Sequence, residues 1–223
     1  MSLATYGGLK TALGKWLLER GTDDITDRVP EFFQLARTRI FYGCSEPGFE
    51  SQPLRIRFME TSADLTIDGN DVDLPDGFLQ QRRLYIDSTA PMPAPEFLAP
   101  SAFRDRFPTG DTTTGYPRYY TVEGDVMVFG PLPDTTYTGK LLYYKIPDAL
   151  SADADSDWLT QNAPGVYLFS AMTEFAWFDG SDDDLAMKYA ARFAGAVNSL
   201  MYADALDRWS GAKMTARPAG PTP

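Results

Sequence analysis

Carboxylates are concentrated in one segment of the chain, residues 146–187, which contains no lysine and no arginine. Carboxylate side chains can cap helices, because they accept hydrogen bonds from free backbone N–H groups and favour the positive end of the helix dipole. They can also bind calcium through their oxygens, or form an acidic wall that repels the phosphates of DNA. The acidic residues of the segment are Asp148, Asp153, Asp155, Asp157, Glu174, Asp179, Asp182, Asp183 and Asp184.

Helix capping is the simplest of these interpretations, since Asp155 or Asp157 and the run 181–184 stand just before predicted helices. Calcium binding is disfavoured, because the loops SADADSD, GSDDD and DGNDVD lack the ligand spacing of an EF-hand, and we expect no metal site. The third interpretation predicts a surface that DNA can pass without binding. The candidate residues for such an acidic lumen, or for a subunit contact, are Asp153, Asp155, Asp157, Asp182, Asp183 and Asp184.

Most catalytic chemistry is excluded by composition. The 223 residues include no histidine and a single cysteine, Cys44, which excludes a Ser-His-Asp triad, a Cys-His pair and metal sites built on histidine or several thiolates. Nucleotide-binding and hydrolase motifs are missing, and we expect neither a cofactor nor an enzyme. Paired carboxylates could still hydrolyse glycosides, and aromatic residues could stack on sugars. The alternative function is therefore a carboxylate-dependent glycan hydrolase or a carbohydrate-binding module.

Basic residues are outnumbered, with 20 lysines and arginines against 31 aspartates and glutamates, a net charge of −11. This excess of acidic residues argues against a protein that binds nucleic acid tightly. The arginines of the central region have two interpretations, as solvated strand edges or as partners of the acidic segment in a neighbouring copy. Such a head-to-tail contact between unlike patches closes into a ring when the rotation allows. The candidate interface arginines are Arg55, Arg57, Arg104 and Arg106.

Association with a membrane is not expected. No apolar run approaches the roughly 18 residues that a transmembrane helix needs. The first residues, MSLATYGGLKTALGKW, lack the basic start and continuous apolar stretch of a signal peptide.

Four segments have the hydrophobic spacing of amphipathic helices, and they are residues 5–20, 26–42, 163–179 and 182–209. The middle of the last segment is rich in small residues, which let another helix approach closely. Three of them, Ala190, Ala194 and Gly195, therefore join the candidate subunit interface.

The middle of the chain, about residues 50–147, has the short β-branched and aromatic runs that are typical of strands. Asp68-Gly69-Asn70 and Glu123-Gly124-Asp125 are each predicted to turn a β-hairpin. Residues 89–117 form a long proline-rich connection with one helical turn near 100–106, and loops of this length are usually functional or form an interface. The predicted strands are 55–60, 63–67, 71–74, 84–87, 119–124, 125–130 and 140–146.

These elements predict an α+β fold in which a discontinuous helical bundle is interrupted by an antiparallel β-rich module. Residues 1–48 and 150–209 form the helical domain, and residues 49–149 form the β-rich insertion. Residues 210–223 are expected to be a flexible tail, because they hold few large apolar groups. The candidate docking residues of this tail are Lys213, Met214 and Arg217.

The ordered series of Gly/Pro and aromatic motifs resembles the head-to-tail adaptor (connector) proteins of tailed bacteriophages. PEFFQLARTRI at 30–40 looks like the second helix of that family, and LPDGF at 74–78 with RRLY at 82–85 looks like its strand-turn-strand. No single motif is specific, but the similarity runs over about residues 26–205. The motifs similar to its β module and to the start of its C-terminal helices are GYPRYY (115–120), GD (124–125), GPLP (130–133), LYYKIP (142–147), WL (158–159) and PGVYLF (164–169).

The resemblance implies a structural virion protein rather than an enzyme. Under the alternative function, the glycan hydrolase or carbohydrate-binding module would belong to a phage tail or bacterial surface. Members of the family form a ring, commonly of about twelve copies, beneath the portal ring of the capsid. Their helical domain docks on the portal protein, their β part meets the tail tube or nozzle, and double-stranded genomic DNA passes transiently through the middle. The terminal tail often reaches onto a neighbouring ring, which residues 210–223 could do by folding on binding. The implied location is the neck or tail region of the virion, after assembly in the host cytoplasm.

Overall fold

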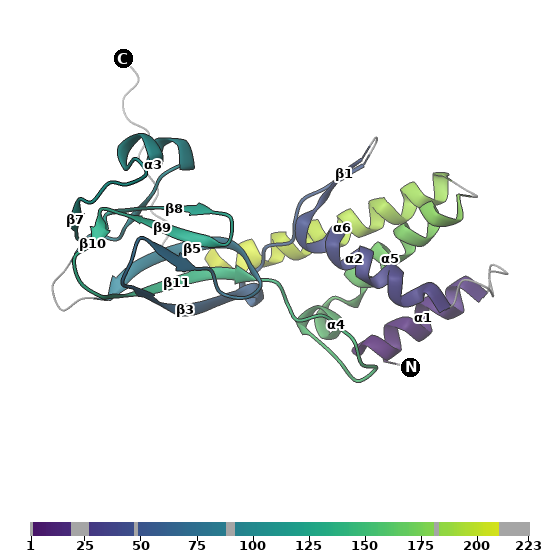
Figure 1. The fold of residues 1–223 in the computed structure, drawn as a ribbon. Helices are drawn as coiled ribbons and strands as arrows, with labels where there is room; N and C mark the ends of the chain where they lie inside the picture. Colours follow the sequence, from purple (N-terminus) through teal and green to yellow (C-terminus); the bar gives the residue numbers. More distant parts are fainter. Residues whose placement is uncertain (1, 19–26, 47–48, 88–91, 181–182, 210–223) are drawn as a thin grey trace, which may run out of the picture. The chain divides into compact units, whose positions relative to one another are not determined.

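The computed structural model describes residues 2–18, 27–46, 49–87, 92–180 and 183–209. Over these residues the fold is mixed, with six α-helices and several mostly antiparallel sheets, which confirms the predicted α+β class (Figure 1). The chain divides into two compact units. We call residues 1–57 with 148–223 the helical unit and residues 58–147 the β unit. None of the described helices is long and apolar enough to cross a membrane.

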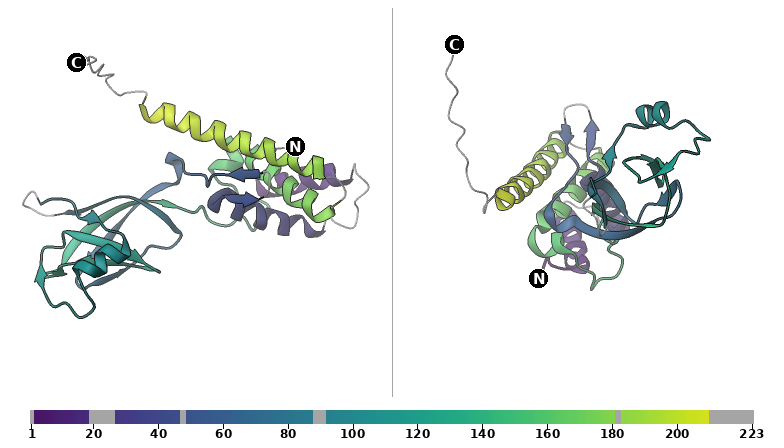
Figure 2. Two further views of the ribbon diagram at one scale, coloured as in Figure 1. Left: turned by 90° about the horizontal axis from the view of Figure 1, so that it is seen from above. Right: turned by 90° about the vertical axis from the view of Figure 1, so that its left-hand side faces the viewer.

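The central helix of the helical unit is α5 (Pro164–Asp179). It packs against α2 (Val29–Tyr42) and α6 (Asp183–Trp209), and also against α1 (Tyr6–Leu18) and the short α4 (Trp158–Asn162) (Figure 2). Nine of its 16 residues are buried. Because neighbouring helices contact it on several sides, its apolar residues do not form the one-sided stripe of a surface helix.

The ends of these helices follow from local chemistry. Proline stands in the first turn of both α2 and α5, where its missing N–H costs no hydrogen bond. Helix α2 ends at Gly43 with φ 78°, and α5 ends at Gly180 with φ 61°, in the left-handed region that favours glycine. After α2, the strands β1 (Cys44–Glu46) and β2 (Phe49–Ser51) pair antiparallel.

The β unit is built from two main sheets. The first is antiparallel and has the order β3 (Glu60–Ile67), β11 (Tyr137–Lys145), β5 (Phe78–Asp87). The second has the order β4 (Asp71–Asp73), β9 (Val126–Gly130), β8 (Tyr119–Glu123), β6 (Glu96–Phe97), with β6 parallel to β8. The remaining elements are the short parallel strands β7 (Thr114–Gly115) and β10 (Leu132–Pro133) and the helix α3 (Pro100–Arg106).

Side chains from both sheets share one hydrophobic core. Ile67 and Leu141 come from the first sheet, and Met127 and Phe129 come from the second, and all four are at most 1% exposed. The alternation of buried and exposed positions along β3 and β5 is that of sheets with one face toward a core.

Two predictions for this region are wrong. Residues 55–60 do not form a strand, because Arg57–Met59 forms the 3-10 turn η2 and β3 begins only at Glu60. The turn at Asp68-Gly69-Asn70 does not close a hairpin, since β3 pairs with β11 while β4 pairs with β9. The local sequence sets the turn, but the packing of two sheets decides which strands become partners.

Two other predictions for the β unit are confirmed. Strands β8 and β9 form a hairpin around Glu123-Gly124-Asp125, in which Gly124 has φ 61°. The helical turn expected near 100–106 is α3, and within the described part of the 89–117 connection it is accompanied by β6 and β7.

Candidate interaction surfaces

An acidic loop of the helical unit, residues 148–157, lies against the first turn of α1, and we call it the acidic strap. The amides of Tyr6 and Gly7 donate to the backbone carbonyls of Asp155 and Asp153, at 2.9 and 3.0 Å. The first N–H groups of a helix have no partner within it. The strap supplies such partners with its main chain.

An ion pair joins the strap to the same helix. The Lys10 ammonium lies 2.5 Å from Oδ1 of Asp153 and 4.6 Å from the ring centre of Tyr6. The hydrogen bond to Asp153 raises the pKa of Lys10. The Asp153 side chain is 76% exposed, so the pair adds little stability.

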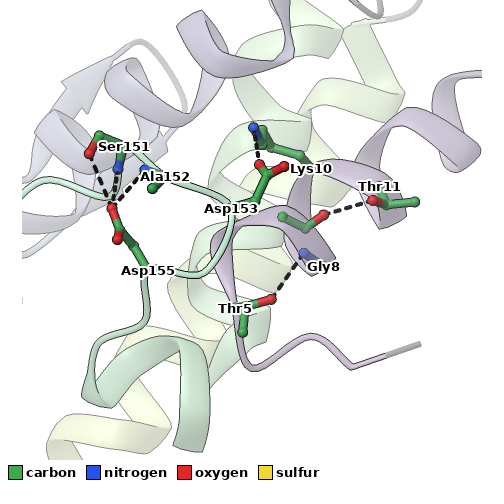
Figure 3. Close-up of polar contacts among 9 residues, drawn as sticks. Thr5, Gly8, Lys10, Thr11, Ser151, Ala152, Asp153 and Asp155 are labelled. Carbon is green, nitrogen blue, oxygen red and sulfur yellow. Dashed lines mark hydrogen bonds and ion pairs between the residues drawn. The ribbon is translucent and has the colours of Figure 1, made fainter.

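Asp155 holds the strap in shape from within. Its Oδ2 accepts hydrogen bonds from the Ser151 amide at 2.8 Å, the Ser151 hydroxyl at 3.1 Å and the Ala152 amide at 2.7 Å (Figure 3). These donors, led by the Ser151 amide, lower the pKa of Asp155, because they stabilise the charged form.

Asp157 caps helix α4. Its Oδ1 accepts from the Thr160 amide at 2.7 Å, and the Thr160 hydroxyl accepts from the Asp157 amide at 2.9 Å, which makes a reciprocal capping box. Its Oδ2 accepts from the buried Tyr167 hydroxyl at 2.7 Å. Burial, reinforced by this carboxylate, raises the pKa of Tyr167. At Asp157 the capping interpretation is therefore confirmed.

The other acidic candidates lie at the start of α6. Asp184 is exposed, Asp183 begins the helix, and Asp182 lies outside the described residues. The candidate tail residues Lys213, Met214 and Arg217 also lie outside them. The part of the chain that the structure describes contains no group of three or more potential metal ligands.

The candidate arginines of the β unit have partners in the same unit. Arg104 Nε donates to Glu123 Oε1 at 2.9 Å, and the same two side chains make a second contact through Nη2 and Oε2. This hydrogen bond to Glu123 raises the pKa of Arg104. Arg106 is exposed, and its guanidinium carbon lies 4.0 Å from the ring centre of Tyr119.

The candidate arginines of the helical unit stabilise the segment after β2. Arg55 Nη1 donates to the carbonyls of Phe41 and Leu54 at 2.8 and 2.7 Å. Arg57 is exposed, its amide donates to Asp204 Oδ1 at 2.8 Å, and its guanidinium lies 3.7 Å from the Asp207 carboxylate.

The three small residues singled out on α6 are not equivalent. Ala190 is fully buried on the face that also carries Ala186, Phe193 and Val197, so packing within the helical unit already uses it. Ala194 is half-buried, whereas Gly195 is exposed and a Cβ there would meet no atom within 4 Å. The spacing in the sequence did not distinguish the inner face from the outer one.

A buried ion pair between α2 and α5 was not predicted. Arg39 Nε lies 2.5 Å from Glu174 Oε1, with side-chain exposures of 7% and 12%. The Arg39 guanidinium carbon also lies 4.5 Å from the ring centre of Trp177. The two residues are 135 positions apart, and no local motif links them.

The helical unit also contains a groove with a volume of about 300 Å³, which the sequence did not indicate. We call it the aromatic groove. It lies between α1, α2, α5 and the acidic strap, and its lining residues are Tyr6, Pro30, Phe33, Gln34, Arg37, Ala149, Leu150, Ser151 and Tyr167. The four lining residues from α2 have the spacing i, i+3, i+4, i+7 of one helix face.

Comparison with known proteins gives one family. A family model described as SU10 adaptor protein matches residues 4–218, a range that includes residues of both units. No curated protein matches the chain.

Proposed function

The chain belongs to the SU10 adaptor protein family, and from this membership we propose that it is a structural adaptor of a bacteriophage virion. The observation that carries the proposal is the length of the match, which extends over residues 4–218. The adaptor would assemble in the host cytoplasm and occupy the neck, between the portal protein and the tail nozzle or tail tube. In this arrangement the helical domain, residues 1–48 and 150–209, docks on the portal, and the β-rich insertion, residues 49–149, faces the tail.

The adaptor acts as a closed ring, of about twelve copies by its resemblance to head-to-tail connectors. A ring built by rotation uses two unlike patches of each copy, one for each neighbour. Arg57, Arg106 and Gly195 are exposed, so an adjacent subunit can contact them, and Arg57 also pairs with Asp207 of its own chain. Asp153 and Asp184 are exposed acidic residues that suit the opposite patch or the ring lumen.

The net charge of −11 supports a conduit for DNA. Binding to a duplex is driven by cations that neutralise phosphates, and like charge opposes it. An acidic ring can therefore surround a moving genome without holding it.

The direct test is assembly on the portal protein of the same virus. The purified chain is mixed with the portal, and the product is analysed by light scattering and electron microscopy. Ring-shaped particles attached to the portal are expected. A folded chain that neither binds the portal nor forms a ring would overturn the proposal.

A charge reversal at Arg106 tests the head-to-tail contact. Arg106→Glu should reduce ring formation, because it places like charge against the acidic patch of the neighbour. Arg83→Glu, an equal change at an exposed position of β5 outside the candidate set, is the matched control. Unchanged assembly of the Arg106 variant would remove this residue from the interface.

A further inference from the structure

Helix α2 presents an exposed row of side chains that we call the α2 stripe. Leu35 and Tyr42, seven residues apart on this face, are large side chains that are 53% and 63% exposed. The alternating three- and four-residue spacing of the row places its members on one side of the helix. The residues of the α2 stripe are Arg28, just before the helix, and Glu31, Leu35, Thr38 and Tyr42, and all five are exposed.

Helix α6 presents a second exposed row, which we call the α6 stripe. Its residues are Asp184, Lys188, Ala191, Gly195 and Asn198, and all five are exposed. At Gly195 an added Cβ would meet no atom within 4 Å. The large side chains of one helix pack into the grooves of another, and short side chains leave such grooves open.

Helices α2 and α6 run in the same direction, because both are antiparallel to α5 (Figure 2). Phe32, near the start of α2, lies 5.8 Å between ring centres from Phe178, near the end of α5. Only residues 180–182 separate α5 from α6, and these two helices pack against each other. Neighbours in a ring of about twelve copies differ by a rotation of about 30°, which changes any helix direction by no more than that angle. Helix α2 of one copy and α6 of the next are therefore within the range of preferred packing angles.

The charges of the two stripes are complementary in this parallel direction. When Arg28 lies level with Asp184, Glu31 lies within one residue of the level of Lys188, a difference of about 1.5 Å. Each of these pairs joins opposite charges. The Arg28 guanidinium carbon also lies 5.2 Å from the ring centre of Phe178 in its own chain, but both residues stay exposed. In the antiparallel direction the charged start of the α2 stripe would lie against the uncharged end of the α6 stripe.

The sizes of the side chains also match in the same register. Leu35 lies level with Ala191, since each stands seven residues beyond the first charged pair. Its side chain fits the hollow between Ala191 and Gly195. Tyr42 lies level with Asn198 after seven further residues, and the Asn198 amide can bond to the Tyr42 hydroxyl.

We propose that the α2 stripe of one copy packs against the α6 stripe of the next copy in the ring, with Arg28 facing Asp184 and Glu31 facing Lys188. The proposal rests on the ring of the proposed function. It names the two unlike patches that such a ring needs.

Disulfide trapping in rings assembled on the portal tests this contact. Cys44→Ser removes the native thiol, and Leu35→Cys is combined either with Ala191→Cys or with Ala205→Cys. Ala205 is an exposed α6 position 14 residues farther along, about 21 Å away, so it serves as the matched control. Under mild oxidation the Ala191→Cys pair should give at least roughly five times more disulfide-linked chains than the control pair, measured on denaturing gels.

A charge exchange gives a second, independent readout. Glu31→Lys and Lys188→Glu should each reduce the fraction of chains in rings at least roughly threefold, because each change brings like charges together. The variant with both changes restores an opposite pair and should recover ring formation. Far-UV circular dichroism confirms that each variant is folded.

The outcomes distinguish this contact from the adaptor role. Rings that form on the portal with equal disulfide yields for the two cysteine pairs, or without recovery in the double charge variant, would overturn the contact and leave the adaptor role intact. A parent chain that forms no ring at all would overturn both.

Discussion

At the scale of single residues, most of the carboxylates described on the acidic strap have a structural task within the chain. Asp153 pairs with Lys10, Asp155 binds the amides of its own loop, and Asp157 caps α4. Acidic composition therefore supplies local hydrogen bonding as well as surface charge. Whether the same side chains face a DNA lumen stays a prediction.

Among the aspartates of the acidic strap, Asp157 is expected to contribute the most to stability. Asp157→Ala removes the cap of α4 and leaves the Tyr167 hydroxyl, in a residue only 2% exposed, without this acceptor. The loss of unfolding free energy should be about 2 kcal/mol, measured by urea denaturation. Asp157→Asn keeps an oxygen that can cap the helix, so it should cost less than half as much; an equal cost would contradict the role of the cap.

Because of Asp155, the unfolding free energy is expected to fall in acid. Its pKa is lowered in the folded state by the Ser151 and Ala152 amides, so its contribution is complete above the ordinary carboxyl pKa of about 3.9 and is lost as pH falls through the folded value. Asp155→Asn should therefore unfold with a weaker pH dependence below about pH 4 than the parent chain. The control is Asp148→Asn, which removes the same charge without these donors. If the unfolding free energy of the parent chain and of Asp155→Asn changed equally with pH, the stabilising role assigned to the Asp155 carboxylate would be refuted.

At the scale of elements, α5 organises the helical unit because the other helices pack around it. The Arg39–Glu174 pair joins α5 to α2. Helix α6 also packs against α5, and the buried face of α6 includes Ala186 and Ala190. Aromatic contacts add to the α2–α5 junction, where Phe32 lies 5.9 Å from Phe175 between ring centres. Polar and apolar contacts thus fix one register of the two helices.

The buried pair should show strong coupling in a double-mutant cycle. Glu174→Leu alone should cost about 3 kcal/mol, because it removes the carboxylate partner of a buried guanidinium. The double variant Arg39→Met with Glu174→Leu should cost less than either single change, since two apolar side chains can pack where two charges lay. Additive costs in thermal or urea unfolding would show that the two side chains act independently.

The two faces of α6 predict opposite effects of adding volume. Gly195→Ala should stabilise the monomer by about 0.5–1 kcal/mol, because the added methyl meets no atom and alanine favours the helix. Ala190→Leu should destabilise it by about 1–3 kcal/mol, since that position is fully buried. Thermal unfolding of both variants checks the assignment of faces, and a destabilised Gly195→Ala monomer would contradict it.

At the scale of the whole molecule, family membership and charge lead to the same proposal. The match over residues 4–218 makes the chain an adaptor-family protein, and its net charge is −11. A protein with this negative charge is better suited to let DNA pass than to bind it. The number of copies in the ring and the order of its partners stay predictions.

The charge gives a measurable expectation for DNA. The purified chain, alone or assembled, should not retard a duplex in a gel-shift experiment at about 0.15 M salt, because it lacks the clustered cations that phosphate binding needs. A variant in which the four aspartates of the acidic strap are changed to asparagine serves as the comparison. This variant should bind the duplex at least as well as the parent chain does. Tight, salt-sensitive binding by the parent chain would count against a repulsive conduit.

The sequence alone determined the features that depend on neighbours along the chain. The four long helices, the β8–β9 hairpin, the helical turn at 100–106 and the cap at Asp157 follow from side-chain periodicity, glycine turns and capping chemistry, which act over a few residues. The predicted domain boundaries, and the placement of interface residues, stay predictions.

Only the tertiary structure decided the features that join distant residues. The partner of β3, the Arg39–Glu174 pair, the inner face of α6 and the aromatic groove each combine residues from separate parts of the sequence. Local periodicity shows that a face is apolar or a turn is tight, but it does not show what covers that face. That choice is made by the packing of the whole unit, because the burial of apolar surface depends on which elements meet in space.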